Sequence, residues 1–261
     1  MERLMVIKLV GQGCSAQAWF NGLPMACVSP QASLVVVPAH EAALVGANRL
    51  ELVMVPDTGV SVPPTAPHAM AAQVHLLLPR VDHVIDETQA RVLAQLDWSC
   101  DAGEPLALPA RRVQEAELPI RFPRWRWLDA PVVQLTPALT QQAHAFITGL
   151  ARDLARGQTE SFMAATRLRT EELALAYQRS PESETARLRE YLEQMYASSR
   201  LAWQSLALEE MQLRPLVGGR LLECLGMDGR AALTTLPDKA GNTVALPLKL
   251  SVVEGRFYVL R

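Results

Sequence analysis

The sequence predicts a two-domain fold, in which an N-terminal all-β sandwich precedes a C-terminal α+β domain of three helices followed by an antiparallel β-meander. Residues 136–204 form a long block in which apolar side chains recur at helical spacings of three and four. Short strand-like runs separated by turn residues lie on both sides of this block. The length of 261 residues also exceeds the usual size of one hydrophobic core. We therefore expect a sandwich at 1–128, a linker at 129–135 and an α+β domain at 136–261.

Composition and charge narrow the class of protein. Apolar residues make up 49% of the chain and charged residues 20%, which is typical of folded cores. The net charge of −2 gives no electrostatic argument for nucleic acid or an anionic membrane. No apolar run approaches the roughly 20 residues that span a bilayer, and the N-terminus lacks the pattern of a signal peptide. We expect a cytoplasmic protein with no membrane span and no nucleic-acid partner, and leave homo-oligomer formation open.

The N-terminal half contains regular short strands, and its clearest turn is Asn21-Gly22. Both residues tolerate the positive φ of a two-residue type I′ turn, so the flanking segments should pair as a hairpin. In that register Cys27 would face Ala16, and Pro24 would place the returning strand at a sheet edge. The predicted strands cover residues 3–10, 16–20, 33–37, 50–55, 72–78, 89–98 and 111–122.

Two segments of this half carry a family resemblance. The pairing of "AWFNGLPM" with "LVGANRLELVMV" resembles the strand–NG–strand and later G-x-N-x-L-x-L pattern of galactose-binding-like and immunoglobulin-like accessory β-sandwich domains. The resemblance implies a sandwich fold for this half. Its elements are common turn chemistry, so it implies no particular ligand.

Three helices are predicted in the central block. Thr136 can cap the first helix, and Pro137 suits its first position. A second helical run covers 159–178, where the polar step 167–172 leaves a break into two helices open. The third run begins near Pro181 and carries one apolar stripe, which we expect to be buried. That stripe contains Leu188, Tyr191, Leu192, Met195, Tyr196 and Ser199.

An antiparallel meander is predicted after the helices. Its turns lie at Gly218-Gly219, Asp228-Gly229 and Glu254-Gly255. The predicted strands cover residues 206–217, 220–225, 231–236, 243–253 and 256–260. Helices followed by a meander predict an α+β domain with the helices packed on one face of the sheet. This order, closed by the segment "GRFYVLR", resembles the nuclear-transport-factor-2-like proteins, which implies a cone-shaped domain.

Four cysteines, at 14, 27, 100 and 224, form no CxxC pair and flank no histidine at metal-binding spacing. Free, buried thiols in a reducing compartment are therefore expected. We predict no disulfide, no structural metal and no cofactor.

No grouping of residues typical of catalysis is found. The five histidines are scattered, and the adjacent pairs Glu171-Glu172 and Glu209-Glu210 point their members to different faces. The sequence contains no GxSxG, P-loop or GxGxxG motif. We therefore predict no catalytic residues and a protein that is not an enzyme.

The segment Arg124-Trp125-Arg126-Trp127 is the most conspicuous candidate for partner binding. In an extended chain the two arginines share one face and the two tryptophans the other. Bases could stack on such a ladder, but no wider positive field accompanies it. The structural interpretation is that the tryptophans bury area at the domain join while the arginines are solvated. We expect the arginines to contribute to partner binding and a tryptophan to fix the two domains.

By elimination, the leading interpretation is a non-enzymatic protein-binding module, such as a bacterial immunity protein or secretion adaptor. The alternative is an enzyme or small-ligand-binding protein that uses the hollow of the C-terminal domain. The residues expected to line that hollow are His144, Tyr177, Tyr191 and Trp203. A third interpretation, carbohydrate binding by the sandwich, needs an exposed aromatic platform, for which Trp19 and Trp98 are the candidates.

Overall fold

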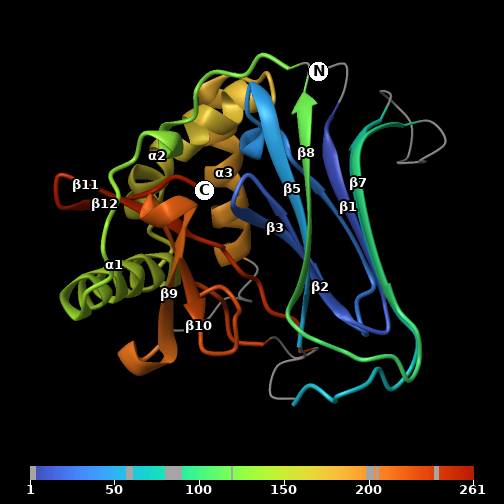
Figure 1. The fold of residues 1–261 in the computed structure, drawn as a ribbon. Coiled ribbons are helices and arrows are strands. Elements are labelled where there is room, and N and C mark those ends of the chain that lie inside the picture. Colours follow the sequence, from blue (N-terminus) through green and yellow to red (C-terminus); the bar gives the residue numbers. More distant parts are fainter. Residues whose placement is uncertain are drawn as a thin grey trace. The chain divides into compact units, whose positions relative to one another are not determined.

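A computed structural model describes residues 4–56, 61–79, 90–118, 120–197, 203, 206–237 and 241–261. Its internal contacts divide into two compact units, Met1–Arg124 (unit 1) and Trp125–Arg261 (unit 2), and each is described by itself (Figure 1). In the described part, twelve strands form three antiparallel sheets, and three α-helices lie in the C-terminal half. The predicted mixture of strands and helices is confirmed, while the predicted division into two domains stays a prediction.

Unit 1 contains two four-stranded sheets, with strand orders β4-β1-β6-β7 and β3-β2-β5-β8. The strands are β1 (Val6–Gln12), β2 (Ser15–Phe20), β3 (Leu23–Val28), β4 (Leu34–Pro38), β5 (Gly46–Val55), β6 (Met70–Leu78), β7 (Arg91–Cys100) and β8 (Ala110–Leu118). Alternate side chains are buried, such as Ile7 and Leu9 on β1 and Val74 and Leu76 on β6. Because side chains alternate along a strand, the residues between these point to the opposite face of the sheet.

The hairpin at Asn21-Gly22 forms with the predicted two-residue turn, since Phe20 pairs with Leu23. Beyond the turn the register shifts between Ala18 and Trp19, next to Pro24 on the partner strand. Proline has no N–H to donate to the ladder, which favours an irregularity at this point. Cys27 consequently pairs with Gln17, and the prediction that it faces Ala16 is wrong.

Side-chain amide hydrogen bonds join the Asn21-Gly22 turn to the later segment "GANRL", residues 46–50. The side chain of Asn48 is buried, and its Oδ1 accepts from the Leu44 N–H and from Asn21 Nδ2, each at 2.8 Å. Its Nδ2 donates to the carbonyl oxygens of Leu44 and Gly46, also at 2.8 Å. Asn21 Oδ1 in turn accepts from the Arg49 N–H. The pattern therefore marks a satisfied polar turn, which needs no ligand to explain it.

The last strand of each sheet in unit 1 meets the other along one edge. β7 ends one sheet and β8 ends the other, and the two strands contact each other. The backbone N–H of Gln95 on β7 donates to Oε1 of Gln114 on β8 at 2.9 Å. The Gln114 side chain thus binds a backbone N–H of β7 on the edge that faces away from β6.

Unit 2 contains three helices and a sheet of order β12-β11-β10-β9. The elements are α1 (Pro137–Ala155), α2 (Glu160–Ala176), α3 (Pro181–Ala197), β9 (Met211–Leu216), β10 (Leu221–Gly226), β11 (Lys249–Val253) and β12 (Arg256–Val259). Oγ1 of Thr136 accepts from the Leu139 N–H at 3.1 Å, which confirms the predicted cap of α1. α2 is continuous, so the break considered at 167–172 does not occur. The strand predicted at 231–236 is replaced by isolated bridges.

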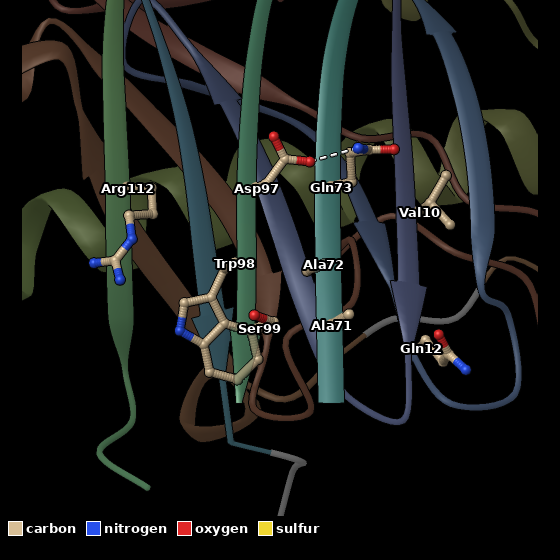
Figure 2. A pocket seen from close by; sticks show the side chains of 9 residues that line it. All are labelled: Val10, Gln12, Ala71, Ala72, Gln73, Asp97, Trp98, Ser99 and Arg112. Carbon is tan, nitrogen blue, oxygen red and sulfur yellow. Dashed lines mark hydrogen bonds between the residues drawn. The ribbon is translucent and has the colours of Figure 1, made fainter. Parts of the chain in front are cut away.

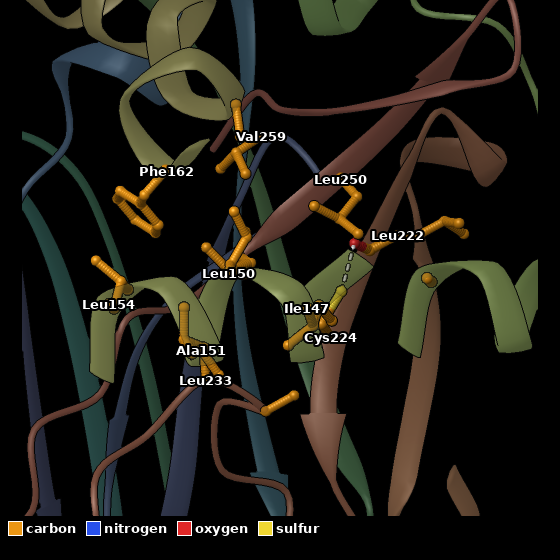
Figure 3. Close-up of a cluster of buried hydrophobic side chains, with 14 of the residues drawn as sticks. Ile147, Leu150, Ala151, Leu154, Phe162, Leu222, Cys224, Leu233, Leu250 and Val259 are labelled. Carbon is orange, nitrogen blue, oxygen red and sulfur yellow. Dashed lines mark hydrogen bonds between the residues drawn. The ribbon is translucent and has the colours of Figure 1, made fainter. Parts of the chain in front are cut away.

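A hydrophobic cluster fills the space between the helices and the sheet of unit 2 (Figure 3). α1 contributes Ile147, Leu150 and Leu154, and the sheet contributes Leu222 and Leu250, all of them buried. No helix in the described part of the chain is both long enough and apolar enough to cross a membrane.

The apolar stripe of α3 ranges from buried to exposed along the helix. Leu192 is only 3% exposed, whereas Tyr191 and Tyr196 are 45% and 51% exposed. The prediction of a fully buried stripe is therefore wrong, since Leu188 and Met195 are only half-buried and both tyrosines are exposed. Ser199, the last residue of the predicted stripe, lies outside the described residues.

The four cysteines are free thiols, and Cys14, Cys100 and Cys224 are buried as expected. Cys27 is exposed, so the expectation that all four are buried is wrong for this residue.

Candidate functional site

A groove of about 520 Å³ lies on unit 1, where neighbouring strands present polar side chains (Figure 2). We call it the Trp98 groove. Its lining residues are Val10 and Gln12 on β1, Ala71, Ala72 and Gln73 on β6, Asp97, Trp98 and Ser99 on β7, and Arg112 on β8. The antiparallel pairing of β1, β6 and β7 brings together residues that are far apart in the sequence.

Two glutamines hold the carboxylate of Asp97. Gln73 lies directly opposite Asp97 in the β6–β7 register, and its Nε2 donates to Oδ1 (Figure 2). Gln95 lies two residues earlier on the same face of β7, and its Nε2 donates to Oδ2 at 2.9 Å. A carboxylate offers about four acceptor sites, so two amide hydrogen bonds leave about two for a ligand. Asp97 is therefore a fixed acceptor at the surface.

Trp98 supplies an apolar surface to the groove. Its indole extends from β7 toward β8, the strand that carries Arg112 (Figure 2). The side chain is half-buried and packs against a small cluster of Ala66, Cys100 and Leu106. This packing holds one part of the ring in place, and the exposed part lines the groove.

Asp97 and Arg112 bring opposite charges to one groove without neutralising each other. Both side chains are exposed. In the part of the chain that the structure describes, Arg112 forms no ion pair, and the side-chain partners of Asp97 are neutral amides. The groove thus carries one negative and one positive charge that a ligand can reach.

The lining groups suit recognition rather than a reaction. They comprise amides, one hydroxyl, one carboxylate and one guanidinium, and Ser99 has no histidine or lysine beside it in the lining. Among the described residues, no three His, Cys, Asp or Glu side chains gather as a metal site requires. A groove with an apolar wall and a few fixed polar groups is typical of a binding site.

A second cavity of about 250 Å³ in unit 1 is mainly apolar, with a wall of prolines, Val55, Met70 and Leu108. At this cavity the ring Nε2 of His68 lies 2.9 Å from the carbonyl oxygen of Gly13, so it carries the proton and donates. The lining includes no charged carboxylate or guanidinium group. The cavity therefore offers less to orient a ligand than the Trp98 groove does.

The segment predicted for partner binding has two different kinds of side chain. Trp125 and Trp127 are 1% and 0% exposed, whereas Arg124 and Arg126 are exposed. The guanidinium carbon of Arg261 lies 5.4 Å from the ring centroid of Trp125 and 5.9 Å from that of Trp127. Both indoles are interior side chains that cannot touch a partner directly in this structure. Partner binding therefore stays a prediction for Arg124 and Arg126 alone.

Arg126 is already engaged within unit 2. Its NH2 lies 2.8 Å from Oε2 of Glu171, and its NH1 donates to the carbonyl oxygen of Leu168 at 3.1 Å. These bonds tie the side chain to α2, because both acceptors belong to that helix. Arg126 is consequently less suited to an acidic partner than the sequence alone indicates.

The residues predicted to line a hollow in the C-terminal half lie on different elements with different partners. His144 on α1 donates from Nε2 to the Leu206 carbonyl oxygen at 2.7 Å. Tyr177 lies beside Arg179, and Tyr191 on α3 is 45% exposed. Trp203 bridges to Thr235 and packs against the hydrophobic cluster of unit 2. Because that cluster fills the space between the helices and sheet, these contacts give no support to a shared pocket.

Sequence reasoning did not find the Trp98 groove. A signal was present, since Gln95 and Asp97 alternate along one predicted strand, Ser99 continues the alternation just beyond it, and Gln73 interrupts another strand that is otherwise mostly apolar. The alternation shows that these side chains share a face, but it does not show which strands are neighbours. The link between Gln73 and Asp97 depends on that pairing.

Comparison with known proteins adds no identification, because no family model, no curated protein and no solved structure matches the chain. The resemblances to galactose-binding-like, immunoglobulin-like and nuclear-transport-factor-2-like proteins therefore stay predictions.

Proposed function

We propose that the protein is a non-enzymatic protein-binding module and that the Trp98 groove is part of its binding surface. The observation that carries the proposal is a groove whose lining combines the fixed carboxylate of Asp97 with an indole and an exposed guanidinium. Tryptophan and arginine are enriched among the residues that dominate binding energy at protein interfaces. Asp97 is ordered before binding, which lowers the entropic cost of using it.

The size of the groove favours a short segment of the partner. A volume of about 520 Å³ lies within the range that encloses small ligands, about 300–1,000 Å³, and is too small for a domain. We therefore propose that a partner inserts a loop or terminus here while the flanking surface supplies further contacts.

The wider proposal follows the leading interpretation of the sequence. Unit 1 acts as a β-sandwich domain and unit 2 as an α+β domain, in a cytoplasmic protein such as an immunity protein or secretion adaptor. Arg124 remains a proposed contributor to partner binding through its exposed position. Arg126 contributes less, because its guanidinium is bound to α2.

The test is affinity capture from the native cell, followed by titration of the captured partner. Arg112→Ala should weaken binding without loss of fold, because the side chain is exposed and forms no ion pair in the described part of the chain. Trp98→Ala should weaken binding further, and Trp19→Ala is a matched control on the other sheet. A partner that binds Arg112→Ala and Trp98→Ala as tightly as the wild type would exclude the groove as the binding surface.

Carbohydrate binding by unit 1 is a second candidate, favoured by the half-buried indole of Trp98 next to a carboxylate and amides. The ring can stack on the apolar face of a sugar, and polar groups of the groove lining can bind hydroxyl groups of the same glycan. A glycan array probed with the wild type and with Trp98→Ala separates the candidates. Glycan binding that depends on Trp98 would favour this candidate over a protein partner.

A further inference from the structure

We infer that the Trp98 groove recognises a dipolar segment of a polypeptide, with a basic side chain at Asp97 and an acidic side chain at Arg112. This inference rests on the proposed function and adds the chemistry of the bound segment. It follows from the two charges that share the groove without pairing with each other.

Asp97 fits a cationic group. Its two oxygens each accept one amide hydrogen bond, from Gln73 and from Gln95, and both donors are neutral. The negative charge is therefore uncompensated while the direction of the carboxylate is fixed. An ammonium or guanidinium group supplies both the charge and the donors that the remaining lone pairs accept.

Arg112 fits a carboxylate. Its guanidinium is exposed and has no acidic partner among the described residues. The planar fork of N–H donors matches a carboxylate in a bidentate arrangement. An acidic side chain of the ligand would thus be held at the β8 side of the groove.

A ligand with both charges satisfies the groove better than a ligand with one. A purely cationic ligand gains from Asp97 and is repelled by Arg112, and a purely anionic ligand has the reverse balance. The Trp98 indole also lines the groove and can cover the methylene stem of a lysine or arginine. The volume of about 520 Å³ has room for a short segment that carries both side chains.

The probes are capped tripeptides, acetylated and amidated so that side chains carry all the charge. Lys-Gly-Glu and Glu-Gly-Lys are dipolar, Lys-Gly-Lys and Glu-Gly-Glu carry one sign, and Gln-Gly-Gln is neutral. In calorimetric titration of the full chain, one of the two dipolar peptides should bind about tenfold more tightly than the two single-sign peptides and the neutral peptide. The reason is that it alone forms two partly exposed ion pairs at once. The advantage should shrink at high salt because exposed charges are screened.

Two charge-neutralising variants test the assignment of each end. Asp97→Asn and Arg112→Gln should each weaken the dipolar peptide by a factor of about 2 to 5, the effect of one partly exposed ion pair. For Lys-Gly-Lys the signs should differ, with Asp97→Asn weakening and Arg112→Gln strengthening its binding. Glu117→Gln and Arg91→Gln are matched controls at exposed positions of β8 and β7 outside the groove lining, and should change nothing.

Several outcomes would overturn the inference. If Trp98→Ala abolishes binding of the dipolar peptide but neither charge variant alters it, the dipolar assignment is wrong and the groove stands as a binding surface. If no capped peptide binds, the inference is wrong. The proposed function is wrong as well only if the Arg112→Ala and Trp98→Ala variants capture the partner as well as the wild type does. If glycylglycine with free termini binds more tightly than the capped dipolar peptides, the ligand of the groove is a small zwitterion and the assignment to a polypeptide segment is wrong.

Discussion

The carboxylate of Glu172 on α2 accepts a hydrogen bond from the guanidinium of Arg261 at 2.5 Å, and both side chains are only 4% exposed. The other carboxylate oxygen accepts from the backbone N–H of Arg126 at 2.5 Å. One buried carboxylate therefore joins α2 to the end of unit 2 and to the segment that carries Trp125 and Trp127. The guanidinium of Arg261 also lies near both indole rings.

Removing the charge of Glu172 should strongly destabilise unit 2. Glu172→Gln removes the carboxylate charge that pairs with the buried Arg261 guanidinium, so we expect a loss of about 3–5 kcal/mol in the free energy of unfolding. Urea denaturation measures it. Glu171→Gln is the control, because its pairs with Arg126 and Arg167 are partly exposed and should be worth about 1 kcal/mol or less. Equal effects of the two variants would contradict the importance of the buried pair.

The Asn48 amide should stabilise unit 1 more than any single surface residue. Asn48→Ala removes four hydrogen bonds and leaves partly buried backbone groups of Leu44 and Gly46 without these partners, so the expected cost is about 2–4 kcal/mol. Gln141→Ala, at an exposed position of α1, should change stability by about 0.5 kcal/mol or less. Thermal unfolding of both variants tests the difference, and equal melting temperatures would show that the network contributes nothing.

Two adjacent residues on α3 should behave differently on truncation. Leu192 is 3% exposed, so Leu192→Ala should cost about 2–5 kcal/mol as a large-to-small change in a core. Tyr191 is 45% exposed, and Tyr191→Ala should cost clearly less. Chemical denaturation of the pair tests this. A larger loss for Tyr191→Ala would mean that the outer face of α3 is covered in solution.

The Cys224 thiol should make stability fall at alkaline pH. Burial raises the pKa of Cys224 well above its ordinary value of 9.0, and the charge of Glu223 acts in the same direction. The raised pKa means that the unfolded chain releases this proton first, so stability is complete below about pH 9 and declines as pH rises further. The slope can reach about 1.4 kcal/mol per pH unit for one proton. Cys224→Ala should flatten the dependence of unfolding free energy on pH, and an unchanged slope would show that another group causes the decline.

Local chemistry in the sequence predicted the elements better than their partners. The start of α1 was predictable because Thr136 and Pro137 act within one turn. The continuity of α2 was not, since the polar residues at 167–172 suggested a break. In the structure the Thr170 hydroxyl donates a hydrogen bond to the Thr166 carbonyl oxygen within the helix, and Glu172 binds Arg261, which is distant in the sequence. A sequence does not show that a polar residue will find so distant a partner.

The candidate site was harder to predict for the same reason. Trp98 was considered as an aromatic platform, but its neighbours come from three other strands. The segment at 124–127 drew attention because its residues are adjacent in the sequence. Burial of Trp125 and Trp127, and the bonds from Arg126 to α2, depend on contacts that adjacency does not show.

The hydrogen bond from the Gln95 N–H to Gln114 has a consequence for aggregation. β7 is the last strand of its sheet, and unpaired N–H groups on such a strand are a template for pairing with other chains. Gln114 occupies one of these donors, and β8 lies where an incoming strand would approach. Shielding of this kind hinders the edge of β7 from recruiting further copies of the chain at high concentration.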